Sequence, residues 1–216
     1  MKQALMGCAA ALSAFGFAHA GVTTYDNLAD FTAAIGGAPT TSETFDNDIP
    51  SGDPLTFDSG VAVTKGGTVF GNRVTGGRYE TFTDGDNPTT EIWTFPIPII
   101  GFGMDVFSVN SSSFDGVQVT INDGSGDQTF VLFDILFPGG GPSNGDGFVG
   151  FTTMSAITSV VFTGVGDGAM NVGDIWSADN LVFAQGNVAP EVPVPAAALL
   201  FAPAALLAAR RRKASA

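Results

Sequence analysis

Oxygen-bearing side chains dominate the chemistry that this sequence offers. The chain contains 21 Asp and Glu residues against 8 Lys and Arg, with one Cys and one His. Calcium binds six to eight oxygen ligands from carboxylates, amides and carbonyls. Two distant segments, ETFDND and SADNLVF, together offer Glu43, Asp46, Asp48, Asp179 and Asn180. This set predicts one structural Ca²⁺ if the first and last strands of the fold are neighbours.

A second acidic stretch, Asp84-Gly85-Asp86-Asn87, forms a compact predicted turn. It offers another place for a calcium ion. The alternative interpretation of both stretches is that they are solvent-facing turns, because Asp beside Gly or Asn is ordinary turn chemistry.

Carboxylates are also the catalytic groups of glycosidases, which hold an acid and a base or nucleophile about 5–10 Å apart. Glu80, Glu91 and Asp105 are the candidates for such a pair. Nothing in the sequence pairs them, so we expect a protein that is not an enzyme. A carboxylate glycosidase stays third among the functions considered.

Positive charge is scarce between Gly21 and Glu191, where only Lys65, Arg73 and Arg78 are basic. Tyr79 lies beside two of these cations, and together with Arg73 and Arg78 it predicts a surface contact for an anionic polysaccharide. The alternative is three isolated cations that reduce self-repulsion. The acidic balance of this segment repels phosphate backbones, so we expect no binding to nucleic acid.

The first twenty residues have the three parts of a secretory signal peptide: Lys2, an apolar stretch from Ala4 to Phe17, and the small-x-small triplet Ala18-His19-Ala20. We expect signal peptidase to cleave before Gly21. Cys8 and His19 are the only Cys and His, so the exported protein would contain neither. A Cys nucleophile, disulfides, a Ser-His-Asp triad and zinc sites built on imidazole or thiolate are then excluded.

One short helix is predicted directly after the signal. Leu28, Phe31 and Ile35 recur at i, i+3 and i+7, with Asp26 or Asn27 as the N-cap and Gly36-Gly37 as the stop.

Beyond this helix the apolar period changes from about 3.6 to 2. Val117, Val119 and Ile121 alternate with polar residues, which predicts a strand from Gly116 to Asn122 with one face on a core. Nine further strands are predicted at Thr41 to Phe45, Val61 to Lys65, Tyr79 to Thr83, Thr90 to Phe95, Ile100 to Val109, Thr129 to Leu136, Phe148 to Thr152, Thr158 to Thr163 and Ile175 to Phe183. Ten short strands separated by turn residues predict a β-sandwich.

Aromatic composition sharpens this expectation, since the chain has 19 Phe but only 2 Trp and 2 Tyr. Phe has no polar atom to satisfy, so it suits the dry space between two sheets. Trp93 and Trp176 fall in predicted strands and are expected in the core. Pro96 and Pro98 cannot donate to a strand ladder, which predicts an edge or a crossing between the sheets.

The chain ends with an uncharged segment from Val192 to Ala209, close to the length of about 20 residues that a membrane-spanning helix needs. The cluster Arg210, Arg211, Arg212 and Lys213 follows. Such cations remain on the cytoplasmic side, which predicts an inner-membrane segment with the preceding domain outside. One interpretation is a plain C-terminal anchor.

The order of Pro motif, apolar span and basic end resembles the PEP-CTERM sorting signals of Gram-negative bacteria. Val192-Pro193-Val194-Pro195-Ala196 resembles the VPLPA variant, with Val194 where that variant usually has Leu. The resemblance implies recognition by an exosortase-type processing enzyme, cleavage near the motif, and release or attachment of the exported domain at the cell surface. Each proline keeps the residue before it out of the α conformation, so the motif stays extended, as a protease groove requires.

The remaining sequence is also similar to domains that carry such tails, in the segments YDNLADFTAAIGG, ETFDN and ADNLVF. That similarity implies a jelly-roll sandwich with lectin-like topology and a role in exopolysaccharide or biofilm matrix.

The chain is therefore expected to have three parts: a signal peptide at 1–20, an extracellular β-sandwich at 21–189, and a sorting signal at 190–216. The expected function is a structural or adhesive part of the extracellular matrix. A calcium-dependent carbohydrate-binding module is the alternative.

Overall fold

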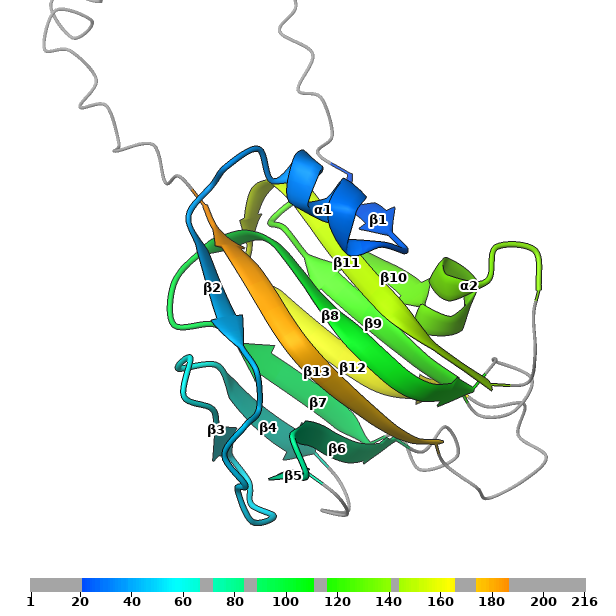
Figure 1. Cartoon of the computed structure of the whole chain (residues 1–216). Helices are drawn as coiled ribbons and strands as arrows, with labels where there is room; N and C mark the ends of the chain where they lie inside the picture. Colours follow the sequence, from blue (N-terminus) through cyan, green and yellow to red (C-terminus); the bar gives the residue numbers. More distant parts are fainter. Residues whose placement is uncertain are drawn as a thin grey trace, which may run out of the picture.

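A computed structural model describes residues 21–66, 72–83, 89–110, 116–140, 144–165 and 174–186. These residues form two antiparallel β-sheets that face each other, with two short helices beside them (Figure 1). The prediction of an all-β sandwich is confirmed. The expected signal peptide and the C-terminal segment lie outside the described residues, and within those residues no helix is long and apolar enough to cross a membrane.

Seven strands form the first sheet, called sheet A: β1 (Thr23–Tyr25), β2 (Thr40–Glu43), β5 (Arg73–Thr75), β6 (Arg78–Thr83), β8 (Ile99–Asn110), β11 (Asn144–Ile157) and β13 (Asp174–Gln185). They lie in the order β1-β11-β8-β13-β6-β5. β2 also pairs with β13, along its second half, whereas β6 pairs along its first half. The final described strand is thus an interior strand of the sheet.

Six strands form the second sheet, called sheet B: β3 (Leu55–Thr56), β4 (Ala62–Gly66), β7 (Thr90–Thr94), β9 (Gly116–Asn122), β10 (Asp127–Val131) and β12 (Ser159–Val165). They lie in the order β10-β9-β12-β7-β4-β3. β7 belongs to sheet B and β8 to sheet A, so Pro96 and Pro98 lie in a crossing between the sheets, as predicted.

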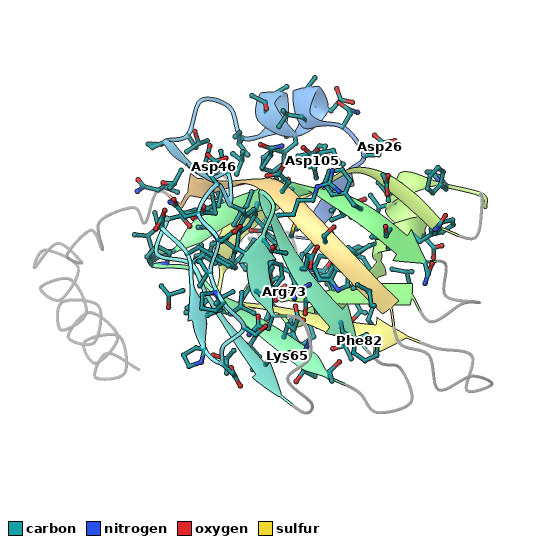
Figure 2. All side chains as sticks on the ribbon, turned by 60° about the horizontal axis from the view of Figure 1, so that its bottom comes forward. Asp26, Asp46, Lys65, Arg73, Phe82 and Asp105 are labelled. Carbon is teal, nitrogen blue, oxygen red and sulfur yellow. The ribbon has the colours of Figure 1, made fainter. Side chains whose placement is uncertain are left out.

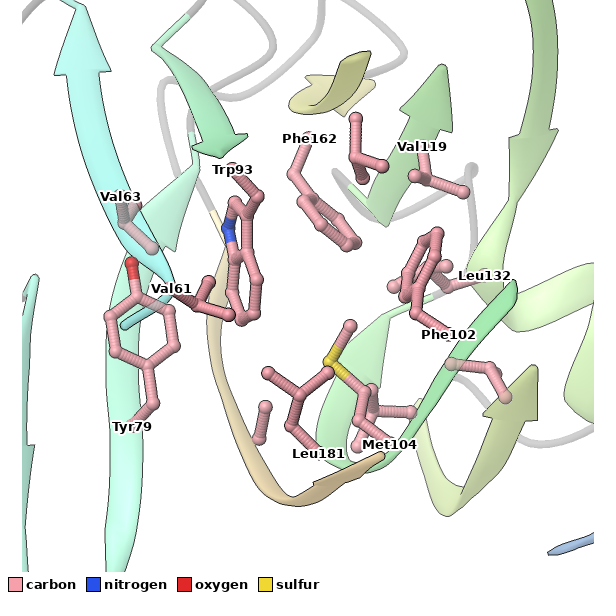
Figure 3. Packing of buried hydrophobic residues seen from close by; sticks show 14 of the residues in the cluster. Val61, Val63, Tyr79, Trp93, Phe102, Met104, Val119, Leu132, Phe162 and Leu181 are labelled. Carbon is pink, nitrogen blue, oxygen red and sulfur yellow. The ribbon is translucent and has the colours of Figure 1, made fainter. Parts of the chain in front are cut away.

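Alternation along the strands fills the space between the sheets. Val117, Val119 and Ile121 of β9 are all fully buried, which confirms their predicted inward face. Trp93 and Trp176 are buried as well, so their expected place in the core is confirmed. Figure 3 shows Trp93 of β7, Phe162 of β12, and Phe102 and Met104 of β8 projecting into the same interior.

The predicted N-terminal helix is present as α1 (Leu28–Ala34). Asn27 is its N-cap, and its Oδ1 accepts a hydrogen bond from Asp30 N at 2.9 Å. Phe31 and Ile35 are buried against the outer face of sheet A, while Leu28 is about half exposed. Gly150 of β11 makes room for this packing, because a β-carbon there would lie 2.9 Å from Phe31 Cδ2.

The prediction of one strand from Thr129 to Leu136 is wrong in its second half. β10 ends at Val131, and α2 (Leu132–Leu136) follows at once. An apolar run such as LFDIL satisfies the periods of both a helix and a buried strand, so pattern alone does not separate them. β11 is also much longer than the predicted strand from Phe148 to Thr152.

Both ends of the described sandwich lie at the same end of sheet A. Thr23 of β1 pairs with Thr152, Thr152 pairs with Gly101, and Gly101 pairs with Ala184 near the end of β13. These four residues form one row across the sheet. We call this the terminal end of the sandwich, and Figure 1 shows it at the top beside α1.

Candidate functional site

The two segments that carry the expected calcium ligands are neighbours, because β2 pairs with β13 and places Glu43 opposite Leu181. The predicted neighbourhood of these two segments is therefore confirmed. Glu43 is almost completely buried. Its carboxylate accepts hydrogen bonds from Phe45 N at 3.1 Å and Ser59 N at 2.8 Å, so it braces the turn that leaves β2.

The other expected ligands also have hydrogen-bond partners within the protein, some local and some distant in sequence. Asp46 Oδ2 accepts from Thr44 Oγ1 at 2.6 Å, and Asp48 Oδ1 accepts from Gly76 N at 3.0 Å. Asp179 Oδ1 accepts from Asn180 N, and Asn180 Nδ2 donates to Asp105 Oδ2 at 2.9 Å. Figure 2 shows Asp46 and Asp105 on the α1 side of the molecule.

Within the described part of the chain, no group of three or more His, Cys, Asp or Glu residues is arranged to hold a metal ion. The expected ligand set is thus not gathered there. The acidic turn from Asp84 to Asn87 lies outside the described residues.

The expected glycan contact at Arg73, Arg78 and Tyr79 is wrong for the tyrosine, which is fully buried. β6 alternates, so Arg78 and Glu80 face outward while Tyr79 and Thr81 face the core. Arg73 forms an exposed ion pair with Glu80 at 2.8 Å. The guanidinium of Arg78 lies 3.7 Å from the ring centroid of Phe107.

The three candidate catalytic acids are not paired either. Glu91 is fully buried, which a substrate-contacting acid cannot be. Glu80 and Asp105 lie on opposite sides of β13, opposite Ser177 and Asp179 respectively. Strand spacing puts their Cα atoms roughly 12 Å apart, and the Asp105 carboxylate accepts a hydrogen bond from Asn180 Nδ2.

Instead, the structure brings together a buried group that we call the polar cluster: Asn72, Lys65, Tyr79, Thr81 and Glu91. Lys65 of β4 is directly opposite Glu91 of β7 in sheet B. Lys65 Nζ lies 3.4 Å from Glu91 Oε1, and neither side chain has any exposed surface. Sheet A supplies Tyr79 and Thr81 from β6, so the cluster spans the gap between the sheets.

Hydrogen bonds connect the members of the polar cluster. Lys65 Nζ donates to Thr81 Oγ1 at 3.0 Å and to the carbonyl oxygen of Phe82 at 2.6 Å. Thr81 Oγ1 in turn donates to Glu91 Oε1. The Tyr79 hydroxyl lies 3.1 Å from Glu91 Oε2 and 2.9 Å from Asn72 Oδ1. Asn72 Nδ2 donates to the carbonyl oxygen of Gly52.

Burial changes the proton affinity of these groups. Desolvation is the main cause in each case: it lowers the pKa of Lys65 and raises the pKa of Glu91. Burial, followed by the charge of Glu91, raises the pKa of Tyr79 well above its ordinary range. Burial therefore shifts the proton equilibrium of all three groups toward their neutral forms relative to water.

The sequence indicates Lys65 as an isolated cation at the end of a predicted strand and Glu91 as a candidate acid, without a connection between them. A signal was present, because Lys65 continues the inward alternation of Val61 and Val63. Glu91 likewise shares the inward face of β7 with Trp93. Applying the period of two to charged residues would have placed both in the core.

A second candidate site is an open cleft of about 640 Å³ between the edge strands β1 and β10, bordered by α2. Its lining includes Thr24, Asp26, Thr129, Phe130 and Asp134. Gln128 Oε1 links the two edges by accepting from Val22 N at 3.1 Å. The cleft thus combines hydroxyls, two carboxylates and an aromatic ring.

No protein-family model matches this chain, and comparison with curated proteins and with solved structures found no match. Inference about function therefore depends on the residues of the chain and their arrangement.

Proposed function

We propose that this chain is an exported protein of the cell surface or extracellular matrix, with a structural or adhesive role, processed at a C-terminal sorting signal of the PEP-CTERM type. The sequence of both chain ends motivates the proposal. Export by signal peptidase precedes recognition of the motif from Val192 to Ala196 by an exosortase-type enzyme.

The observation that carries the proposal is the shared row of Thr23 and Ala184 at the terminal end of the sandwich. Gly21 follows the expected leader, and Gly186 precedes the Pro motif by only a few residues. Both expected membrane-directed segments therefore connect to the same end of the domain. A domain attached in this way holds its opposite end away from the membrane, as a matrix or adhesion module requires.

The test is the intact mass of the mature protein from membrane and medium fractions of an exosortase-bearing host. We expect the N-terminus at Gly21 and a species ending near Val192. Replacing both Pro193 and Pro195 with Ala should leave Arg210 to Lys213 on the protein. Pro190→Ala, just outside the motif, is the matched control and should be processed normally.

A protein that retains its basic end in every variant would show a plain membrane anchor and overturn processing. A full-length chain in the cytosol, with both ends intact, would overturn export altogether.

The edge cleft favours carbohydrate binding as a second function. The carboxylates of the cleft accept hydrogen bonds from sugar hydroxyls, and its hydroxyl groups both donate and accept them. Phe130 offers an apolar surface beside these groups. A glycan array with the full chain, with and without chelator, tests this function. Asp134→Asn should reduce binding strongly, while Asp58→Asn, outside the cleft, should not. Loss of binding with chelator would add a calcium requirement, and equal binding by both variants would exclude this cleft.

A further inference from the structure

The pair Lys65 and Glu91 combines an amine and a carboxyl group in a sealed interior. The two residues are register partners on adjacent strands, so their side chains leave the backbone side by side. Nζ of Lys65 lies 3.4 Å from Oε1 of Glu91, so the amine and the carboxyl group are in close contact. We propose that Lys65 Nζ and Glu91 Cδ condense into an intramolecular isopeptide bond that joins β4 to β7. This inference is independent of the proposed function.

The reaction starts from the neutral forms of both groups. Transfer of one proton from the ammonium of Lys65 to the carboxylate of Glu91 gives an amine with a free electron pair and a carboxylic acid. Burial favours this transfer, since it removes two charges from an apolar interior. The lowered pKa of Lys65 and the raised pKa of Glu91 act in the same direction.

The step then balances without any other reactant. The electron pair of Nζ attacks Cδ and forms the N–C bond. One C–O bond of Glu91 breaks, and its oxygen leaves as water with the proton of the acid and one proton from Nζ. The product is a secondary amide, and no group is oxidised or reduced.

Two neighbouring hydroxyls contact the reacting atoms. The Tyr79 hydroxyl lies 3.1 Å from Glu91 Oε2 and 2.9 Å from Asn72 Oδ1, and its single proton stabilises Oε2 when it is donated there as negative charge develops during attack. Thr81 Oγ1 accepts from Lys65 Nζ and donates to Glu91 Oε1, so one hydroxyl connects the atom that loses protons to the atom that gains them. Both residues come from β6 of sheet A, so the reaction requires the assembled sandwich.

Aromatic rings enclose the site. Tyr79 contacts Phe57 and Trp93 at centroid distances of 5.4 Å each, and Trp176 at 6.3 Å. Figure 3 shows Tyr79 and Trp93 together beside Val61 and Val63. Exclusion of water favours condensation over hydrolysis.

Intact mass spectrometry of the purified full chain tests the proposal directly. We expect the protein to be lighter by one water than the mass of its polypeptide. Trypsin should not cleave after Lys65, and one cross-linked peptide should contain both Lys65 and Glu91. A wild-type protein of full polypeptide mass that is cleaved after Lys65, even after prolonged incubation, overturns the proposal.

Variants separate the chemistry from a structural role. Lys65→Arg keeps the charge but has no amine of the right length, so it should show the full mass. Glu91→Gln should lose ammonia in place of water and so reach the same final mass as the wild type. Tyr79→Phe should condense at least ten times more slowly while keeping the β-sheet circular dichroism spectrum. Equal condensation by Tyr79→Phe would remove the assigned role of Tyr79, and condensation in Lys65→Arg would place the bond elsewhere.

Discussion

Around Phe102 the sandwich interior is filled by aromatic rings and aliphatic side chains, whereas around Tyr79 the same two sheets enclose an amine, a carboxyl group and two hydroxyls. The ring of Phe102 stacks on that of Phe151 with a centroid distance of 5.1 Å, and its centroid lies 5.7 Å from that of Phe95. We call this the aromatic region. In the polar cluster, every ionisable group depends on a specific partner from another strand.

Two kinds of interaction therefore stabilise the core, burial of apolar area and hydrogen bonding between specific polar partners. Rings in the aromatic region contribute through buried area, and neighbouring rings can move to accommodate a change. A buried charge or hydroxyl cannot exchange its partner without a large cost in free energy. We therefore expect the aromatic region to contribute mainly to the free energy of unfolding. We expect the polar cluster to fix the register of β4 against β7 and the position of β6 across the gap between the two sheets.

The largest expected effect is the loss of one member of the buried pair. Glu91→Ala leaves the Lys65 amine without its partner in the core and also prevents the proposed isopeptide bond, so the free energy of unfolding should fall by at least about 3–5 kcal/mol in urea denaturation. The double variant Lys65→Met with Glu91→Leu removes both polar groups and should recover much of this loss. A double variant no more stable than Glu91→Ala would show that charge is not what distinguishes the polar cluster.

A cavity in the aromatic region should cost somewhat less. Phe102→Ala removes a fully buried ring, and the partly buried Phe95 can shift toward the space. We expect a loss of about 3 kcal/mol, and about 1 kcal/mol for Phe102→Leu, measured by the same denaturation. Equal losses in the two variants would contradict a region that depends on buried volume.

The pH dependence of the free energy of unfolding distinguishes the polar cluster from the aromatic region in the variant Lys65→Met. The charge of Lys65 is the largest influence that lowers the pKa of Glu91. Its removal leaves burial to raise this pKa further above 4.5. Below that pH, Glu91 is neutral in both states. As pH rises above it, the unfolded chain loses the proton and the folded chain keeps it, so the free energy of unfolding should fall by up to about 1.4 kcal/mol per pH unit.

The control for this pH effect is Lys65→Met combined with Glu91→Gln, in which the carboxyl group is absent. The free energy of unfolding of this double variant should not fall with rising pH in this way. The difference in unfolding free energy between wild type and Phe102→Leu should likewise be independent of pH. Parallel pH profiles for the single and the double variant would show that burial does not raise the pKa of Glu91 above its value in the unfolded chain.

The smallest effect is expected outside both regions. Arg73→Ala breaks the exposed ion pair with Glu80, and the free energy of unfolding should fall by less than about 0.5 kcal/mol. Arg73→Lys serves as the charge-preserving control. A loss above about 1 kcal/mol would mean that this surface pair contributes as much as an interior hydrogen bond.

The sequence predicted the aromatic region well, because Phe at alternating positions has only one suitable environment in a sandwich. It also predicted α1, whose cap and apolar spacing agree with the structure. β1, β3 and β5 escaped prediction, since strands of two or three residues are too short to show a period.

The length of β11 was missed for a different reason. Asn144-Gly145-Asp146-Gly147 has the composition of a turn, yet it continues the strand opposite β8. A β-carbon at Gly145 would collide with the ring of Phe137, and one at Gly147 with the side chain of Leu136. These glycines allow α2 and the residue after it to approach the strand, a tertiary reason that the local sequence does not reveal.

Among the site residues, proximity was predictable for β2 and β13 but side-chain direction was not. Glu43 turns toward backbone amides, and Asp179 toward Asn180, although both strands are adjacent. The polar cluster depends on three strands from two sheets. Such a meeting follows from topology, which single-strand patterns do not specify.

The interior position of β13 has a mechanical consequence. A pull on Gln185 along the strand axis, as from a C-terminal tether, loads the hydrogen bonds to β8 on one side and to β2 and β6 on the other in shear. Bonds in shear must break together, unlike those of an edge strand peeled off one at a time. A pull at the end of β13 would therefore act on a strand that is hydrogen-bonded on both sides.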